Sequence, residues 1–88
     1  MHGHTYILEV TIEGTVDEFT GMVIDFTNLK YIVNNKALER LDHTILNDTI
    51  NNPTAENIIQ WIYEKVKPAF NQEVHMRLWE TPDSYVEL

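Results

Sequence analysis

Hydrophobic and polar residues alternate at the start of the chain. From His4 the even positions are His4, Tyr6, Leu8, Val10 and Ile12, whereas the odd positions are mostly Thr and Glu. A period of two is typical of a β-strand with one buried face. The pattern therefore predicts a strand that ends near Glu13, with His2 and His4 extending its buried face.

The next apolar pattern has a helical period. A loop over residues 14–21 and a short apolar run, Met22–Ile24, which could form a return strand, lead to Asp25, a good helix N-cap. Apolar residues then recur at helical spacing from Phe26 to Leu41. Asn34-Asn35 consists of poor helix formers. The pattern predicts an amphipathic helix of about four turns.

A second helix follows an irregular segment rich in Asn and Asp. Thr54 can cap this helix, and Pro68 ends it. Between them, an apolar stripe at helical spacing contains Ile58, Ile59 and Ile62.

The C-terminal pattern returns to a period of two over residues 73–81. Val74, Met76, Leu78 and Glu80 share one face, which we expect to be buried, and His75 falls on the outward face. Residues 81–84 form a turn with Pro at its second position, and residues 85–88 close a hairpin. The order strand, helix, helix, strand, strand predicts one α+β domain over residues 1–88, with an antiparallel sheet and both helices on one face.

Composition narrows the possible functions. The chain has 88 residues, no cysteine and a net charge of −8. The negative charge argues against nucleic acid and anionic membranes as partners. Without cysteine there is no disulfide framework and no thiolate. We find no membrane-spanning run and no signal peptide, which fits a cytoplasmic protein.

His2 and His4 are candidate metal ligands. Because a strand rises about 3.3–3.4 Å per residue, their α-carbons would lie roughly 6.5–7 Å apart with both side chains on one side. Two such imidazoles can converge on one Zn²⁺ ion, although they are only half of a tetrahedral site. The alternatives are a disordered chain start or a string of the kind found in purification tags.

Asp42, His43, Glu80 and Thr54 are further candidates. An imidazole beside a carboxylate can act as a general acid or base, although Asp42 and His43 could simply cap the first helix. Glu80 on an apolar face could bind an amidine-like ligand edge through two parallel hydrogen bonds, or it could reach water at the strand end. For Thr54, N-capping is a sufficient explanation.

The combination of these segments resembles the 6-pyruvoyltetrahydropterin synthase / 6-carboxytetrahydropterin synthase (QueD-like) family over essentially the whole chain. The matching segments, in order, are His2-Gly3-His4, Ile24-Asp25-Phe26 with Leu29-Lys30, Leu41-Asp42-His43 with Leu46-Asn47-Asp48, Asn52-Pro53-Thr54-Ala55-Glu56-Asn57, and Trp79-Glu80-Thr81-Pro82.

The resemblance implies a tunnelling-fold (T-fold) subunit that forms a homo-oligomer with active sites between subunits. It implies a zinc-dependent lyase that acts on 7,8-dihydroneopterin triphosphate and makes 6-carboxytetrahydropterin for queuosine and related deazapurines. In that family, His2 and His4 match two of three zinc ligands, and Asp42 and His43 match part of a Cys-Asp-His catalytic set. Glu80 matches the glutamate that anchors the pterin, and Thr54 matches a threonine region lining the pocket.

The sequence also departs from the family pattern. The family has a further strand before the His-Gly-His segment, which carries the third zinc histidine, and a catalytic cysteine just before the pair. The printed chain starts at Met1 and contains no cysteine, so the expectation is a T-fold without its N-terminal strand. Three hypotheses remain open: an active or impaired synthase, a non-catalytic subunit that binds pterin or oligomerises, and an acidic interaction domain without a ligand.

Overall fold

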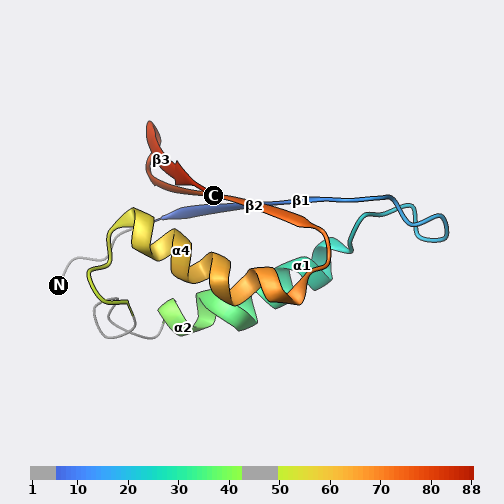
Figure 1. The fold of residues 1–88 in the computed structure, drawn as a ribbon, viewed down its shortest axis with the longest axis horizontal. Coiled ribbons are helices and arrows are strands. Elements are labelled where there is room, and N and C mark those ends of the chain that lie inside the picture. The colour runs from blue at the N-terminus through green and yellow to red at the C-terminus, as the bar shows by residue number, and fades with distance from the viewer. Residues whose placement is uncertain (1–5, 43–49) are drawn as a thin grey trace.

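Three strands form an antiparallel sheet in the order β1-β2-β3 in the computed structural model, which describes residues 6–42 and 50–88 (Figure 1). The strands are β1 (Ile7–Glu13), β2 (Glu73–Thr81) and β3 (Ser84–Glu87). The central strand β2 pairs with β1 in a register that places Val10 opposite Met76. The β2–β3 hairpin and the position of strand β2 are as the sequence predicts.

The sheet has one buried and one exposed face. Val74, Met76 and Leu78 of β2 are buried, and the even-numbered residues of β1 are partly buried against them, whereas the odd-numbered residues are exposed. Since successive side chains of a strand point to opposite sides, the hydrophobic alternation alone determines which face receives the helices.

Both helical segments cover this buried face (Figure 1). The first consists of α1 (Phe26–Val33), the π-helical segment η1 (Asn34–Leu38) and α2 (Glu39–Asp42). The second consists of α4 (Ala55–Val66) and the short 3₁₀ helix η2 (Lys67–Ala69). The expected α+β architecture, with two helices on one side of an antiparallel sheet, is confirmed. Within the described ranges, no helix combines the length and apolar character needed to cross a membrane.

The start of the first helix and its interruption both follow from the sequence. The Asp25 carboxylate accepts a hydrogen bond from the Thr27 amide at 2.9 Å, as expected of an N-cap. The π-helical segment begins at Asn34-Asn35, where helix propensity is low. Phe26, however, was expected on the apolar face and is 74% exposed, whereas Leu29 and Val33 of the same helix are buried.

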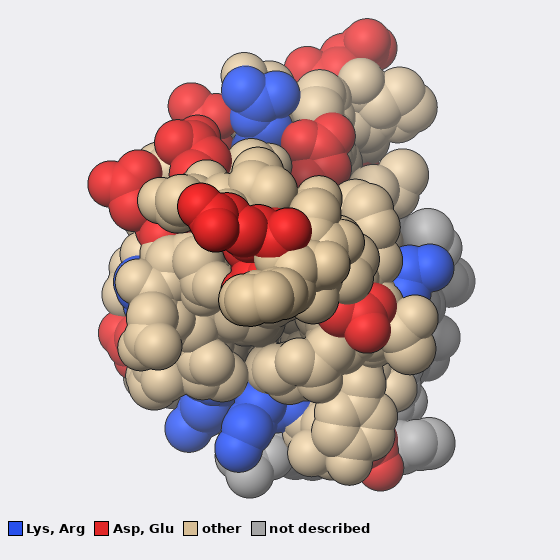
Figure 2. Space-filling view, turned by 90° about the vertical axis from the view of Figure 1, so that its right-hand side faces the viewer, with Lys and Arg blue, Asp and Glu red and all other residues tan. Residues whose placement is uncertain are grey.

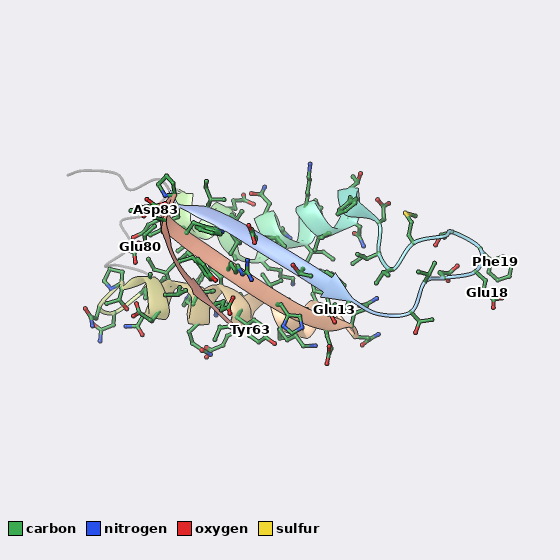
Figure 3. The ribbon with its side chains drawn as sticks, turned by 90° about the horizontal axis from the view of Figure 1, so that it is seen from above. Glu13, Glu18, Phe19, Tyr63, Glu80 and Asp83 are labelled. Carbon is green, nitrogen blue, oxygen red and sulfur yellow. The ribbon has the colours of Figure 1, made fainter. Side chains whose placement is uncertain are left out.

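The prediction of a return strand at Met22–Ile24 is wrong. Residues 14–25 form an arm that projects from the end of the sheet, with Phe19 98% exposed at its tip (Figures 1 and 3). The arm closes on itself, since the Met22 carbonyl accepts from the Asp17 amide at 2.9 Å and Gly21 has a φ of 70°. Met22–Ile24 therefore forms no strand, and the arm is held to the rest of the chain by the Gln72 side chain, which donates to the Val23 carbonyl at 3.4 Å.

The prediction that Glu80 is buried is also wrong. Burial alternates along β2 through Leu78 but then stops, so that Trp79 is partly buried and Glu80 is exposed. The β2–β3 pairing shifts register between Trp79 and Thr81. A bulge of this kind re-aims the side chains beside it, and Glu80 therefore reaches solvent at the end of the strand.

Candidate functional site

Four elements that contain or follow predicted site residues in the sequence end or begin at the same end of the molecule. These are the start of β1, the end of β2 with its turn into β3, the end of α2 and the start of α4 (Figure 1). Glu80 and Asp83 lie at this end, whereas Glu13 lies at the other end of the sheet (Figure 3). The fold thus places chain segments that are far apart in the sequence at one end of the molecule.

Glu80 is an exposed carboxylate with aromatic neighbours. The preceding residue, Trp79, packs on Tyr85 of β3 with ring centroids 4.5 Å apart and planes inclined by 43°. On the other side, Ile7 pairs with Trp79, so Tyr6 lies close to Glu80. The pKa of Tyr6 is raised, first by burial of its hydroxyl and then by the negative charge of Glu80. Glu80 therefore offers an exposed carboxylate near Tyr6, and such a carboxylate can accept two parallel hydrogen bonds from a ligand.

Thr54 acts as a helix cap. Its hydroxyl accepts a hydrogen bond from the Asn57 amide at 3.2 Å, and the Asn57 side chain donates to the Asn52 carbonyl at 2.7 Å. Asn52 has a φ of 53°, a conformation that Asn tolerates better than most residues. This network fixes the start of α4, and hence this end of the molecule.

The structure does not describe the side chains of the other predicted site residues. His2, His4 and His43 lie outside the described residues, as does the side chain of Asp42, whose backbone ends α2. Their roles in binding metal and moving protons stay predictions.

A groove of about 490 Å³ lies on the helix-free face of the sheet, away from Glu80. Arg77 in its lining bonds Glu87 at 2.9 Å and lies 4.9 Å from the centre of the Tyr85 ring. The other lining residues are Glu9, Thr11, Glu13, His75, Met76 and Leu88. His75 lies on the outward face, as its position in the strand predicts. Its neighbours could not be predicted, because only the strand register shows which residues of β1 lie beside it.

Comparison with known proteins gives the family. The family model for 6-pyruvoyl tetrahydropterin synthase matches residues 1–88. The chain is 41% identical over 91 residues to a dihydroneopterin monophosphate aldolase of Pyrococcus furiosus, covering 100% of this chain and 77% of the relative. It is 33% identical over 113 residues to the 6-carboxy-5,6,7,8-tetrahydropterin synthase of Haemophilus influenzae, covering 99% and 80%.

A third relative comes from a eukaryote. The 6-pyruvoyl tetrahydrobiopterin synthase of Dictyostelium discoideum is 33% identical over 91 residues, covering 97% of this chain and 67% of the relative. Together with the fold, these matches confirm the resemblance found in the sequence motifs. The chain belongs to the 6-pyruvoyl tetrahydropterin synthase family.

Proposed function

We propose that this chain is a zinc-dependent pterin lyase that converts 7,8-dihydroneopterin triphosphate to 6-carboxy-5,6,7,8-tetrahydropterin in the cytoplasm, on the route to queuosine. The observation that carries the proposal is that the start of β1, the end of β2, the end of α2 and the start of α4 all lie at the Glu80 end of the molecule (Figure 1). Each of these elements bears or adjoins a residue that matches a family site position.

Glu80 would anchor the pterin. Its carboxylate can accept two parallel N–H bonds from the 2-amino-pyrimidine edge of the ring. Two features support this role: Glu80 is accessible at the strand end, and Tyr6 lies close enough for the charge of Glu80 to raise its pKa.

His2 and His4 would hold zinc. His4 is two residues from Tyr6 along the chain, and two residues reach at most about 7 Å. Imidazole nitrogens are good zinc ligands, so the donor set fits the metal. When bound, zinc would acidify the hydroxyls of the substrate side chain.

Asp42 and His43 would move the proton. The backbone of Asp42 ends α2 at the same end of the molecule as Glu80 (Figure 1). In this role, the Asp42 carboxylate orients the His43 imidazole, and His43 returns a proton to the substrate carbon. Orientation by a carboxylate also fixes which ring nitrogen carries the proton.

A homo-oligomer would complete the site. Within the described residues, β1 and β3 pair with β2 on one edge each. Their other edges can pair with further copies of the chain, which would bring residues of neighbouring subunits to the Glu80 end.

The test compares Glu80→Gln with Asp83→Asn, an exposed carboxylate at the adjacent turn. Glu80→Gln should abolish both pterin binding, followed by fluorescence, and formation of 6-carboxytetrahydropterin in the presence of zinc, while Asp83→Asn retains both. Pterin binding that depends on Glu80 without turnover would instead support the non-catalytic subunit. Binding that is unchanged by Glu80→Gln would contradict the anchor.

A second candidate reaction is aldol cleavage of dihydroneopterin monophosphate. The 41% identity to the Pyrococcus furiosus aldolase favours it. To distinguish the two reactions, the mono- and triphosphate are offered separately. Mass spectrometry then determines which one is consumed and whether the product carries a newly formed carboxylate on the pterin.

A further inference from the structure

Glu13, Glu73 and His75 form a cluster on the helix-free face of the sheet. Glu13 is the last residue of β1 and pairs directly with Glu73, the first residue of β2, while His75 follows two residues later on the same face. This cluster lies at the opposite end of the sheet from Glu80 (Figure 3). It is therefore separate from the site proposed above.

The spacing of the donor atoms matches ligands around a common centre. The Nε2 atom of His75 lies 3.7 Å from a carboxylate oxygen of Glu13 and 3.8 Å from one of Glu73. The three donor atoms all lie within 4.8 Å of one another. These distances are too long for hydrogen bonds. Ligand bonds of about 2.0–2.2 Å in a tetrahedral zinc site place neighbouring donors roughly 3.3–3.6 Å apart, so small side-chain movements suffice.

The local charge also favours a cation. Two carboxylates directly opposite each other on antiparallel strands repel. Arg77, the nearest basic residue along β2, is bonded to Glu87 at 2.9 Å and stacked over Tyr85, so it does not neutralise the glutamate pair. Figure 2 shows acidic side chains gathered mostly over the sheet side of this end, with basic ones mainly on the helix side. Such a surface attracts cations.

We propose that Glu13, Glu73 and His75 bind a divalent transition-metal ion, Zn²⁺ in the first instance, at a site distinct from His2 and His4. Imidazole and carboxylate together suit zinc better than Mg²⁺ or Ca²⁺, which prefer oxygen ligands. The His75 side chain is 51% and the Glu13 side chain 61% exposed, so water can reach the ion and occupy the fourth position.

The test uses the full chain with a single remaining histidine. The sequence has four histidines, and replacing His2, His4 and His43 by Gln leaves His75 alone and removes the other proposed zinc ligands. Titration calorimetry with ZnCl₂ should then give one bound ion per chain. Removing a ligand by His75→Gln or Glu13→Gln should weaken binding roughly tenfold or more.

The matched control is Glu9→Gln. Glu9 lies on the same face of β1, four residues from Glu13, and its replacement changes the charge equally without removing a ligand. Zinc affinity that falls as much in Glu9→Gln as in Glu13→Gln would overturn the proposal, as would affinity unchanged by His75→Gln or no zinc binding at all. If the three side chains form only ion pairs with one another, the chain should bind no zinc here.

The unmodified chain provides a second measurement. In its NMR spectrum, ZnCl₂ should shift the His75 imidazole signals, and these shifts should be absent in Glu13→Gln. An unmoved His75 signal at saturating zinc would overturn the proposal even if a variant failed to fold. Because neither experiment measures turnover, failure of the proposed lyase activity leaves the result intact.

Discussion

Replacing Thr54 by Ala tests whether this residue stabilises α4, binds the substrate, or does both. The Thr54 hydroxyl accepts from the Asn57 amide at 3.2 Å, and an alanine leaves this amide without its partner. Loss of an N-cap costs about 0.5–2 kcal/mol of stability. The bond is slightly longer than the usual 2.9–3.0 Å, and the bond of 2.7 Å from Asn57 to Asn52 remains, so we expect about 1 kcal/mol.

In a domain of this size, 1 kcal/mol lowers the melting temperature by roughly 4–8 °C. The assay is thermal unfolding followed by circular dichroism, at equal concentration for all variants, because assembly would make the midpoint depend on concentration. Thr54→Ser keeps the hydroxyl and should retain most of the stability. An unchanged midpoint in Thr54→Ala, or an equal loss in Thr54→Ser, would refute the capping argument.

The same variants separate capping from substrate binding. If Thr54 only caps α4, then pterin binding by Thr54→Ala, measured well below its melting temperature, should equal that of the unmodified chain. Weaker binding by the folded Thr54→Ala protein, restored in Thr54→Ser, would indicate that the hydroxyl also contacts the pterin.

Two further predictions concern the core and the Tyr6–Glu80 contact. Ile62 is 1% exposed, so Ile62→Ala should lower the free energy of unfolding, measured with urea, by about 2–5 kcal/mol. Tyr31 is 67% exposed, so Tyr31→Ala should change it by no more than about 0.5 kcal/mol. Equal losses of stability in the two variants would contradict the assigned core. Glu80→Gln should lower the raised pKa of Tyr6 only partway toward 10.0, since burial is the larger cause of the shift. The pKa of Tyr6 is measured from phenolate absorbance during a pH titration, after the absorbance of the Tyr6→Phe variant is subtracted. Because the folded state holds the Tyr6 proton more tightly, stability should fall as the pH rises above 10, and this fall should be smaller in Tyr6→Phe.

Much of the fold could be predicted because the local patterns agree with the global structure. Apolar and polar residues alternate along β1 around Val10 and along β2 around Met76, and this alternation determines the buried face of the sheet. The N-caps Asp25 and Thr54 mark the starts of the two helical segments. Met22–Ile24 misled the prediction because a short apolar run resembles a strand, whereas the local bond from Asp17 closes the arm. Local patterns carry no information about which of two possible hydrogen-bond partners a segment finds.

For the candidate sites, the sequence by itself determined residue types and spacing. It identified the family through segments such as His2-Gly3-His4 and singled out Glu80 as a carboxylate on an otherwise apolar face. The tertiary structure decided that Glu80 is exposed, because the register shift at the end of β2 is a property of two paired strands. Only the pairing of β1 with β2 brings Glu13 beside Glu73 and His75, since contacts between residues about 60 positions apart depend on the strand register and not on either strand's own pattern.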